Sequence, residues 1–377
     1  MHASFERLET PCLLLDEARM QRNIDRMRER AGALGVRMRP HLKTCKSIDV
    51  ARRMMASPTG PAAVSTLKEA EYFFGHGVAD LLYCVGIAPA KLAHVAALRR
   101  RGCALTVILD SLEAARALVQ AGAAERERFA VLIEIDSDGH RAGVRPEDPR
   151  LLQIARVLRE GGAQLQGVMT HAGESYNCRS VDAIRAMAEQ ERSCAVAAAQ
   201  RLRAAGHAAP VVSVGSTPTA TFAQRLDGVT EIRTGVYVFN DLVMAGLGVC
   251  AIDDVALSVL ATVIGHQADK GWVLVDAGWM AMSRDRGTAA QPVDQGYGLV
   301  CDAAGAPIDG LVMREANQEH GILAMRDGTR FDAARLPVGS VVRVLPNHAC
   351  ATAAPFDDYR VLRGGEVVAS WPRMNGW

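Results

Sequence analysis

Short apolar runs alternate with longer amphipathic segments over the first two thirds of the chain. The short runs are rich in Val, Ile and Leu, which predicts buried strands, and the segments between them have the length and composition of helices. We expect eight strands, at 36–46 (opening into a loop at its end), 62–67, 80–85, 104–110, 129–136, 165–170, 211–215 and 231–239. Because parallel strands need crossover connections of about a dozen residues or more, this alternation predicts an α/β fold, a (β/α)8 barrel.

The pattern changes at both ends of this series. Residues 10–16 predict a strand and 17–34 a helix, and we expect this pair to lead into the barrel. From about Gly246, strands follow one another with short turns and almost no helix, at 256–265, 271–276, 311–315, 340–345 and 366–371. Strands without helical crossovers pair antiparallel. We therefore predict two domains: the barrel at 11–245, and an antiparallel β-rich domain at 246–377 together with residues 1–10.

Composition narrows the classes of function. Apolar residues make up 49% and charged residues 23% of the 377 residues, as in ordinary globular proteins. The formal net charge of +1 gives no electrostatic reason to expect nucleic acid or an anionic membrane as a partner. The nine cysteines are dispersed, and no run approaches the roughly 20 apolar residues of a membrane span. We expect a cytoplasmic protein with reduced thiols.

The first barrel strand carries one apolar and one cationic face. Alternate side chains leave a strand on opposite sides, so the cationic face holds Arg37, Arg39, His41 and Lys43. Such a face is also typical of a surface strand whose charges lie in water. Lys43, however, ends the strand where parallel barrels place their chemistry, and a lysine there can lose its charge by desolvation and act as a nucleophile. We expect Lys46, beyond the strand, to be a solvated loop charge.

Glycine-rich segments follow the seventh strand and lie on the eighth. Gly215-Ser216-Thr217 opens a helical segment, where backbone N–H groups and hydroxyls can bind an anion, and these two loops commonly bind phosphate in this type of barrel. The alternative is a capping turn without a ligand. Gly235-Val236-Tyr237 favours the phosphate site, because two neighbouring strand ends can form it together.

Polar residues also follow strands five and six. Arg141 could bind a ring nitrogen or a carboxylate at the barrel mouth, or simply lie in solvent. His171, in the segment that runs on to Tyr176, could stack on or orient a bound ring, or be a structural histidine.

The second domain contains a candidate metal site at His348 and Cys350. In an extended segment these side chains point the same way, and imidazole with thiolate is a suitable pair for zinc or a similar divalent ion. Two protein ligands leave positions open for water and substrate, as in catalytic sites. The alternative is a buried cysteine beside a polar histidine. We expect His320 to line the same cleft.

Several motifs together resemble a known family. The runs RPHLKTCKS, EIDSDGHRAGV, THAGESY, VVSVGSTPT, GVYVFNDLVM and PNHACAT resemble the pyridoxal-phosphate enzymes of the alanine-racemase fold type, in the branch of D-serine dehydratases and D-threonine aldolases. The resemblance covers nearly the whole chain and implies pyridoxal 5'-phosphate and a divalent metal (Zn, Mn, Mg or Co) as cofactors. It implies Lys43 as the Schiff-base lysine, Arg141 near the pyridine nitrogen, and His348 and Cys350 as metal ligands. It also implies a set of residues around the phosphate and ring: Gly215, Ser216, Thr217, Gly235, Val236, Tyr237, His171 and Tyr176.

The reaction implied by the resemblance is β-elimination of water from a β-hydroxy D-amino acid, followed by release of ammonia. The expected substrate is D-threo-3-hydroxyaspartate, which would give oxaloacetate, with Lys43 as the base and the metal as a Lewis acid on the β-hydroxyl. A β-carboxylate needs a cation, for which the candidates are Arg284, Arg286 and His320. In this branch His-x-Cys accompanies dehydration and His-x-Asp aldol cleavage, so Cys350 favours an ammonia-forming hydro-lyase.

Three alternatives stay open at this stage. The chain could be a D-serine dehydratase, a retro-aldol enzyme of the D-threonine aldolase type that yields glycine, or a non-catalytic carrier of pyridoxal phosphate. A carrier has no use for a second domain with a ligand pair. The resemblance further implies a homodimer acting on a small-molecule substrate.

Overall fold

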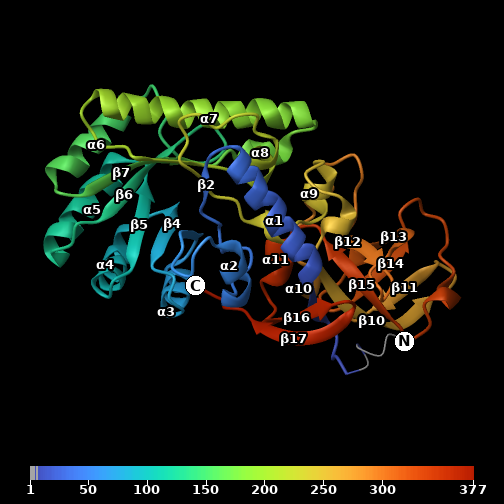
Figure 1. The fold of residues 1–377 in the computed structure, drawn as a ribbon. Helices are drawn as coiled ribbons and strands as arrows, with labels where there is room; N and C mark the ends of the chain where they lie inside the picture. The colour runs from blue at the N-terminus through green and yellow to red at the C-terminus, as the bar shows by residue number, and fades with distance from the viewer. Residues whose placement is uncertain (1–4, 6) are drawn as a thin grey trace. The chain divides into compact units, whose positions relative to one another are not determined.

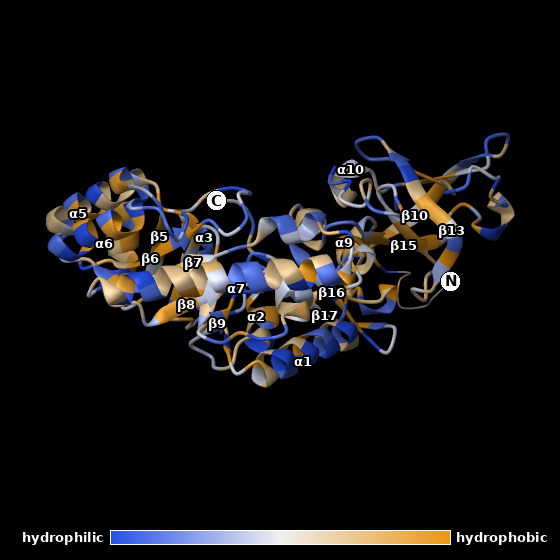
Figure 2. Cartoon of the chain, turned by 90° about the horizontal axis from the view of Figure 1, so that it is seen from above, coloured by the Kyte–Doolittle hydropathy of each residue, from blue (hydrophilic) through white to orange (hydrophobic). Residues whose placement is uncertain are grey.

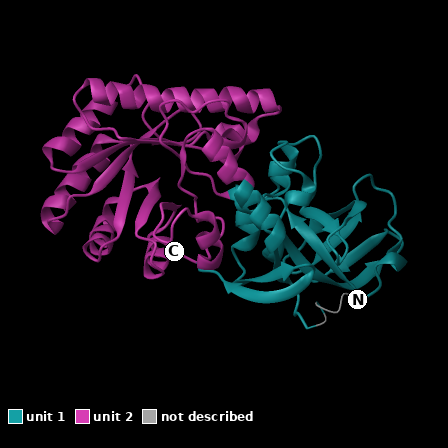
Figure 3. Ribbon diagram, in the orientation of Figure 1, with its two compact units in different colours: residues 1–25, 236–375 teal, residues 26–235, 376–377 magenta. Residues whose placement is uncertain are grey.

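The computed structural model describes Phe5 and residues 7–377. Two compact units make up the chain, residues 1–25 with 236–375 and residues 26–235 with 376–377 (Figure 3). The chain passes between them after Asp25, after Gly235 and again after Asn375. Each unit has its own sheet, so each is described by itself.

The unit of residues 26–235 is a parallel α/β barrel (Figure 1). Its eight strands are hydrogen-bonded in the order β2-β9-β8-β7-β6-β5-β4-β3, and a parallel bridge between His41 and Ala63 joins the first and last of them. The strands are β2 (Arg37–Met38), β3 (Ala62–Val64), β4 (Asp80–Gly86), β5 (Ala104–Leu109), β6 (Ala130–Ile135), β7 (Gln164–Thr170), β8 (Val211–Val214) and β9 (Glu231–Ile232). The predicted eight-stranded parallel series is confirmed.

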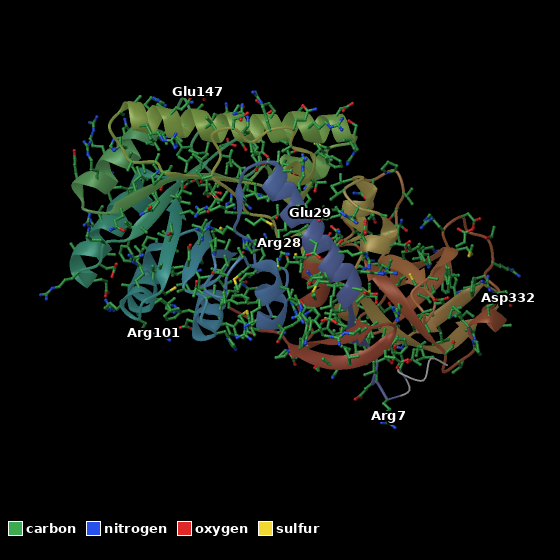
Figure 4. All side chains as sticks on the ribbon, in the orientation of Figure 1. Arg7, Arg28, Glu29, Arg101, Glu147 and Asp332 are labelled. Atoms are coloured by element: carbon green, nitrogen blue, oxygen red, sulfur yellow. The ribbon has the colours of Figure 1, made fainter. Side chains whose placement is uncertain are left out.

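Seven helices connect these strands, one in each crossover. They are α2 (Ile48–Met54), α3 (Leu67–Gly75), α4 (Leu92–Arg100), α5 (Leu112–Glu125), α6 (Arg150–Glu160), α7 (Val181–Ala204) and α8 (Thr217–Phe222). In α6 the buried residues Leu151, Ile154, Ala155 and Leu158 recur at helical spacing, so one face covers the sheet and the other meets solvent. Strands β6 to β8 are largely apolar while α7 mixes both kinds of residue (Figure 2). Charged side chains such as Arg101 and Glu147 project from the outer surface (Figure 4).

The other unit is built on an antiparallel sheet. Its nine strands follow the order β11-β14-β13-β12-β15-β10-β1-β16-β17, and an additional β10–β11 pairing closes six of them into a barrel. The strands are β1 (Cys12–Asp16), β10 (Leu257–Gln267), β11 (Trp272–Val275), β12 (Gly298–Cys301), β13 (Pro307–Ala316), β14 (Gly321–Met325), β15 (Val341–Pro346), β16 (Asp358–Arg363) and β17 (Glu366–Pro372). Three short helices complete the unit, α9 (Leu242–Gly246), α10 (Trp279–Met282) and α11 (Ala349–Ala353).

The first domain boundary differs from the expected one at residue 11. Strand β1 pairs antiparallel with β10 and parallel with β16, so it belongs to the antiparallel sheet and not to the barrel domain. Its apolar residues Leu13, Leu14 and Leu15 are almost fully buried, and its two edges are hydrogen-bonded to β10 and β16. Helix α1 (Glu17–Ala33) then carries the chain into the barrel unit.

The return crossing also differs from the expected boundary at residue 246. The chain leaves the barrel after Gly235, and α9 already belongs to the antiparallel unit. There Leu242 joins a hydrophobic cluster with Leu299, Val312 and Leu345, which explains why this segment is part of that core. Among the described residues, no helix is both long and apolar enough to span a bilayer.

Candidate active site

Lys43 lies at one mouth of the parallel barrel. It follows His41, whose backbone N–H donates to Thr234 O at 2.8 Å, so β2 and β9 fix the start of the loop. The next residue, Leu42, donates its N–H to Ala63 O at 2.8 Å and is fully buried. Lys43 itself is exposed. Hydrogen bonds to both neighbouring strands therefore hold the backbone of a lysine whose side chain remains accessible.

One buried and one half-buried imidazole lie near this lysine. Burial lowers the pKa of His41 well below its usual 6.5, and the charges of Lys43 and Arg233 lower it further. Burial also lowers the pKa of His171 to about 3, again with Lys43 and Arg233 as the next causes. Both rings are therefore neutral at physiological pH. His41 and Lys43, which follow β2, therefore share one electrostatic environment with His171, which follows β7.

The loop after β7 meets the loop after β8. His171 Nδ1 lies 3.4 Å from Gly215 O, and the rings of His171 and Tyr176 are 6.2 Å apart at 44°. Ser175 Oγ and Ser216 Oγ are 2.8 Å apart in a buried contact. The barrel thus brings the predicted residues His171, Tyr176 and the Gly215 loop together.

Ser216 functions as a helix cap. Its Oγ accepts the N–H of Thr219 at 3.2 Å, and Thr219 Oγ1 accepts the N–H of Ser216 at 3.0 Å, which is a reciprocal capping box at the start of α8. The capping alternative is therefore realised for this side chain. A phosphate role for Ser216 and Thr217 stays a prediction.

The backbone N–H of Gly235 lies near the Gly215 loop, because Gly235 follows β9, Gly215 follows β8, and these two strands are neighbours. Its N–H donates to no other described residue. A Cβ at this position would lie 3.0 Å from both His41 O and Thr44 Oγ1, so the backbone must be bare here. Phosphate-binding loops commonly have a glycine whose backbone can approach the phosphate closely and whose N–H group is available to donate to it.

A buried glutamate on α7 organises these loops. Glu191 Oε1 accepts the N–H groups of Ala172 and Gly215, each at 3.0 Å, and Oε2 accepts the hydroxyl of Thr219 at 2.7 Å. Burial raises its pKa, which these three hydrogen bonds partly offset. Sequence reasoning missed this residue, because nothing in the Ala- and Arg-rich sequence of the helix distinguishes it from the more exposed Glu189.

Arg141 lies at the edge of the mouth, with a side chain that is 57% exposed and 3.5 Å from Glu134. Its charge lowers the pKa of His171, after the larger effects of burial, Lys43 and Arg233. Arg233 is the buried guanidinium: its Nε donates to Ser213 Oγ at 2.8 Å and its Nη2 to Thr170 O. The sequence analysis did not single out Arg233.

Lys46 does not lie free in solvent, and that prediction is wrong. Its Nζ is 3.4 Å from Glu69 Oε1, and the lysine side chain is only 19% exposed. A buried carboxylate requires a nearby cation, which Lys46 supplies.

His348 and Cys350 are in contact in the antiparallel unit, but the segment is not extended. His348 is the N-cap of α11 and Cys350 lies in its first turn. Burial lowers the pKa of His348, but hydrogen bonds to Asp285 and Cys350 outweigh it and raise the pKa to about 11. The His348 Nδ1–Asp285 Oδ2 distance is 2.6 Å. Within the described part of the chain, no group of three or more His, Cys, Asp or Glu side chains is arranged to hold a metal.

Two polar residues that the sequence analysis missed fix the backbone around this pair. Asp241 Oδ2 accepts the N–H of Ala349 at 3.0 Å while its Oδ1 caps α9 through Met244 N. Asn347 is buried, and its Nδ2 donates to Gly296 O at 2.7 Å. The side chains of residues 348 and 350 thus extend from a backbone held on both sides.

Comparisons with known proteins place the chain in a family. A family model described as "Alanine racemase, N-terminal domain" matches residues 15–242, and one described as "Putative serine dehydratase domain" matches residues 256–362. The chain belongs to the alanine racemase N-terminal domain family. It is 58% identical to D-threo-3-hydroxyaspartate dehydratase from Delftia sp. (strain HT23), over 98% of both chains. It is 30% identical to a D-serine dehydratase of Dictyostelium discoideum, again over 98% of both.

Solved structures agree with this placement. The structure of the Delftia sp. HT23 enzyme matches with a TM-score of 0.97 and 58% identity, covering 98% of this chain and 99% of that one. A cysteine-to-alanine mutant of D-threo-3-hydroxyaspartate dehydratase, described as being in the metal-free form, also matches with a TM-score of 0.97 at 57% identity, covering 98% and 99%. The two-part alanine-racemase-like fold predicted from the sequence is confirmed.

Proposed function

We propose that this chain is a dehydratase dependent on pyridoxal 5'-phosphate and a divalent metal, acting on β-hydroxy D-amino acids. D-threo-3-hydroxyaspartate is the proposed substrate, with oxaloacetate and ammonia as products. The observation that carries the proposal is 58% identity over 98% of the chain to an enzyme of that name.

The barrel residues fit the cofactor. The N–H of Gly235 lacks an acceptor among the described residues, and the neighbouring loop starts α8 at Ser216. A phosphate group would supply the acceptor that this strand end lacks. We propose that Lys43 holds the cofactor covalently. We propose further that His171, Tyr176 and Arg141 contact its ring, and that its phosphate is bound by Gly215, Ser216, Thr217, Gly235, Val236 and Tyr237.

The antiparallel unit fits an open metal site. His348 and Cys350 supply one nitrogen and one sulfur ligand, a donor set that suits zinc and similar borderline ions. Asp285 orients the imidazole through its other ring nitrogen, as carboxylates commonly do for metal-binding histidines. Because only two protein ligands are present, water and substrate oxygen would complete the shell.

When bound through Lys43, pyridoxal phosphate would supply an electron sink for the substrate α-carbon, and a divalent ion held by His348 and Cys350 would supply a Lewis acid for the β-hydroxyl. We propose that the Lys43 amine removes the α-proton, while neutral His41 and His171 add no competing positive charge beside it. Loss of the α-proton and the β-hydroxyl gives an enamine, whose hydrolysis releases ammonia and a keto acid.

The test is product analysis. Purified protein with pyridoxal phosphate and a divalent ion would be incubated with D- and L-forms of 3-hydroxyaspartate, serine and threonine. We expect ammonia and a keto acid from the D-substrates. Glycine as the main product would instead identify an aldolase, the activity named for relatives at 28–29% identity.

We also infer a homodimer in the cytoplasm. The dimer is expected from the family, in which active sites commonly combine two subunits, and the free cysteines of the described chain agree with a reducing compartment. Light scattering coupled to size exclusion tests the dimer, since a mass of 40.4 kDa would identify a monomer.

A further inference from the structure

Three cations of the antiparallel unit are candidates to bind a second carboxylate of the substrate, and their surroundings differ. Arg286 already has partners: its Nη2 forms an ion pair with Asp294 at 2.8 Å, and its guanidinium lies 5.1 Å from the centroid of the Tyr297 ring. His320 is exposed at a tight turn and can present only one N–H in a given direction. Arg284 forms no ion pair with any described carboxylate.

The Arg284 guanidinium is held flat against an indole. Its central carbon lies 4.0 Å from the centroid of the Trp279 ring, and the side chain is exposed. A stacked guanidinium keeps its in-plane N–H groups free, and these form the fork that binds both oxygens of a carboxylate. Stacking therefore reduces the conformational entropy lost when an anion binds.

The backbone at Trp279, on whose ring Arg284 stacks, is also held in place. Trp279 starts α10, and its N–H donates to Asn317 O at 2.8 Å. A Cβ on the preceding Gly278 would lie 2.2 Å from Gln318 O, so α10 and the turn at 317–320 are in direct backbone contact. The backbone that carries the indole is therefore fixed to this turn.

The backbone before Arg284 is strained. Ser283 has φ 73° and ψ 157°, a region that is essentially limited to glycine and is unfavourable for other residues. Its Oγ accepts the N–H of Asp285 at 3.0 Å, which closes a short turn around Arg284. Such strain persists mainly at functional sites, because the surrounding structure must maintain it.

The turn at residues 283–285 connects Arg284 to the candidate metal site. Asp285, the next residue, contacts His348 at 2.6 Å, and its backbone O accepts Asn347 Nδ2 at 3.3 Å. One strained three-residue turn therefore carries both the carboxylate that orients His348 and an unpaired, stacked guanidinium.

We propose that Arg284 binds the β-carboxylate of the substrate and so sets the preference for a β-hydroxy dicarboxylic amino acid. This inference rests on the dehydratase function proposed above. The β-hydroxyl and the β-carboxylate are bonded to the same carbon of 3-hydroxyaspartate, so a metal that binds the first and an arginine that binds the second must be neighbours. Arg284 is the described guanidinium that meets this requirement without an existing partner.

The experiment compares Arg284→Gln and Arg284→Lys with the wild-type holoenzyme. For Arg284→Gln we expect kcat/KM for D-threo-3-hydroxyaspartate to fall about 100-fold, the scale of a charge-assisted bidentate contact, with a change within about threefold for D-serine. Lysine keeps the charge but loses the fork, so about a tenfold loss is expected. Arg314→Gln, which removes another guanidinium near a Trp ring, is the matched control and should change neither value.

A second measurement does not depend on turnover. Calorimetric titration of the holoenzyme with succinate and with butyrate compares a dicarboxylate with a monocarboxylate of equal chain length. We expect wild type to bind succinate about tenfold more tightly and Arg284→Gln to bind both equally. Retained preference in Arg284→Gln, or its loss in Arg286→Gln instead, would overturn the assignment. Wild type that forms no keto acid from any substrate would refute the proposed function, while the titration would still report on Arg284.

Discussion

At the residue scale, two lysines three positions apart have opposite surroundings. Lys43 is exposed at the barrel mouth beside two neutral imidazoles, whereas Lys46 is partly buried against Glu69. The Lys46 amine is held against a carboxylate and is largely enclosed, so it is less accessible to a cofactor than the exposed Lys43. The geometry therefore favours Lys43 as the covalent attachment point.

The first prediction separates these lysines. Lys43→Ala should lose the visible absorption band of the protein-bound cofactor, while Lys46→Ala should keep it. The measurement is an absorption spectrum after incubation with pyridoxal phosphate and removal of excess. If the band survives in Lys43→Ala and disappears in Lys46→Ala, then Lys46 and not Lys43 is the residue that attaches the cofactor.

The second prediction concerns His171 and pH. Its folded pKa of about 3 is below the usual 6.5, so between these values the unfolded chain takes up a proton that the folded protein does not. Stability should therefore fall as pH decreases below about 6.5, by up to about 1.4 kcal/mol per pH unit for this group. Urea unfolding of cofactor-free His171→Gln at pH 6.5, 5.5 and 4.5 should show a shallower decline than wild type. The exposed His76→Gln should follow wild type, and identical slopes for all three proteins would contradict the prediction.

At the element scale, the barrel was predictable and several of its contacts were not. Eight strands and seven crossover helices follow from apolar runs separated by helical segments, because each strand is buried on both faces. Strands β12, β14 and β16 were missed, since short strands joined by tight turns leave little periodicity to detect. The extended geometry predicted for 348–350 was wrong, because Asp241 accepts the N–H of Ala349 and a helical turn begins there.

The candidate residues at strand ends were predictable for the same reason: parallel strands place their C-terminal ends at one mouth. Glu191 and Arg233 were not, because their roles depend on which loops lie beside them in space. Neither residue type nor spacing distinguishes a buried carboxylate that links two loops from a solvated one on the same helix.

The third prediction tests this link between elements. Glu191→Ala removes the acceptor of two backbone N–H groups and one hydroxyl, which join the β7 loop, the β8 loop and α8. We expect the free energy of unfolding to fall by about 3 kcal/mol, because buried donors left without acceptors are costly. Glu191→Gln, which keeps one acceptor, should lose about 1 kcal/mol.

The control for that experiment lies two residues away on the same helix. Glu189 forms ion pairs with Arg192 and Arg225 at the surface, and its side chain is 43% exposed. Surface pairs contribute little, so Glu189→Ala should cost less than about 1 kcal/mol in urea unfolding. Equal losses for the two alanine variants would mean that Glu191 does not organise the loops.

At the scale of the whole molecule, the proposed chemistry is divided between two compact units. The lysine and the loops proposed to hold the cofactor belong mainly to the barrel, and the histidine–cysteine pair belongs to the antiparallel unit. Each unit has its own sheet and its own hydrophobic cluster. Neither unit alone holds both the amine and the metal ligands.

The last prediction uses this division. Treatment with a chelator should abolish ammonia release while leaving the visible absorption of the bound cofactor unchanged, because Lys43 is not in the unit that carries His348 and Cys350. Added Zn²⁺ or Mn²⁺ should restore turnover in wild type but not in His348→Ala, in which the open site keeps a single protein ligand. The far-ultraviolet circular dichroism of the chelated protein should match that of the untreated protein, since a two-ligand site is not expected to hold the fold together. Undiminished turnover in metal-free protein would show that the β-hydroxyl leaves without a Lewis acid, and the metal ligands would then need a different role.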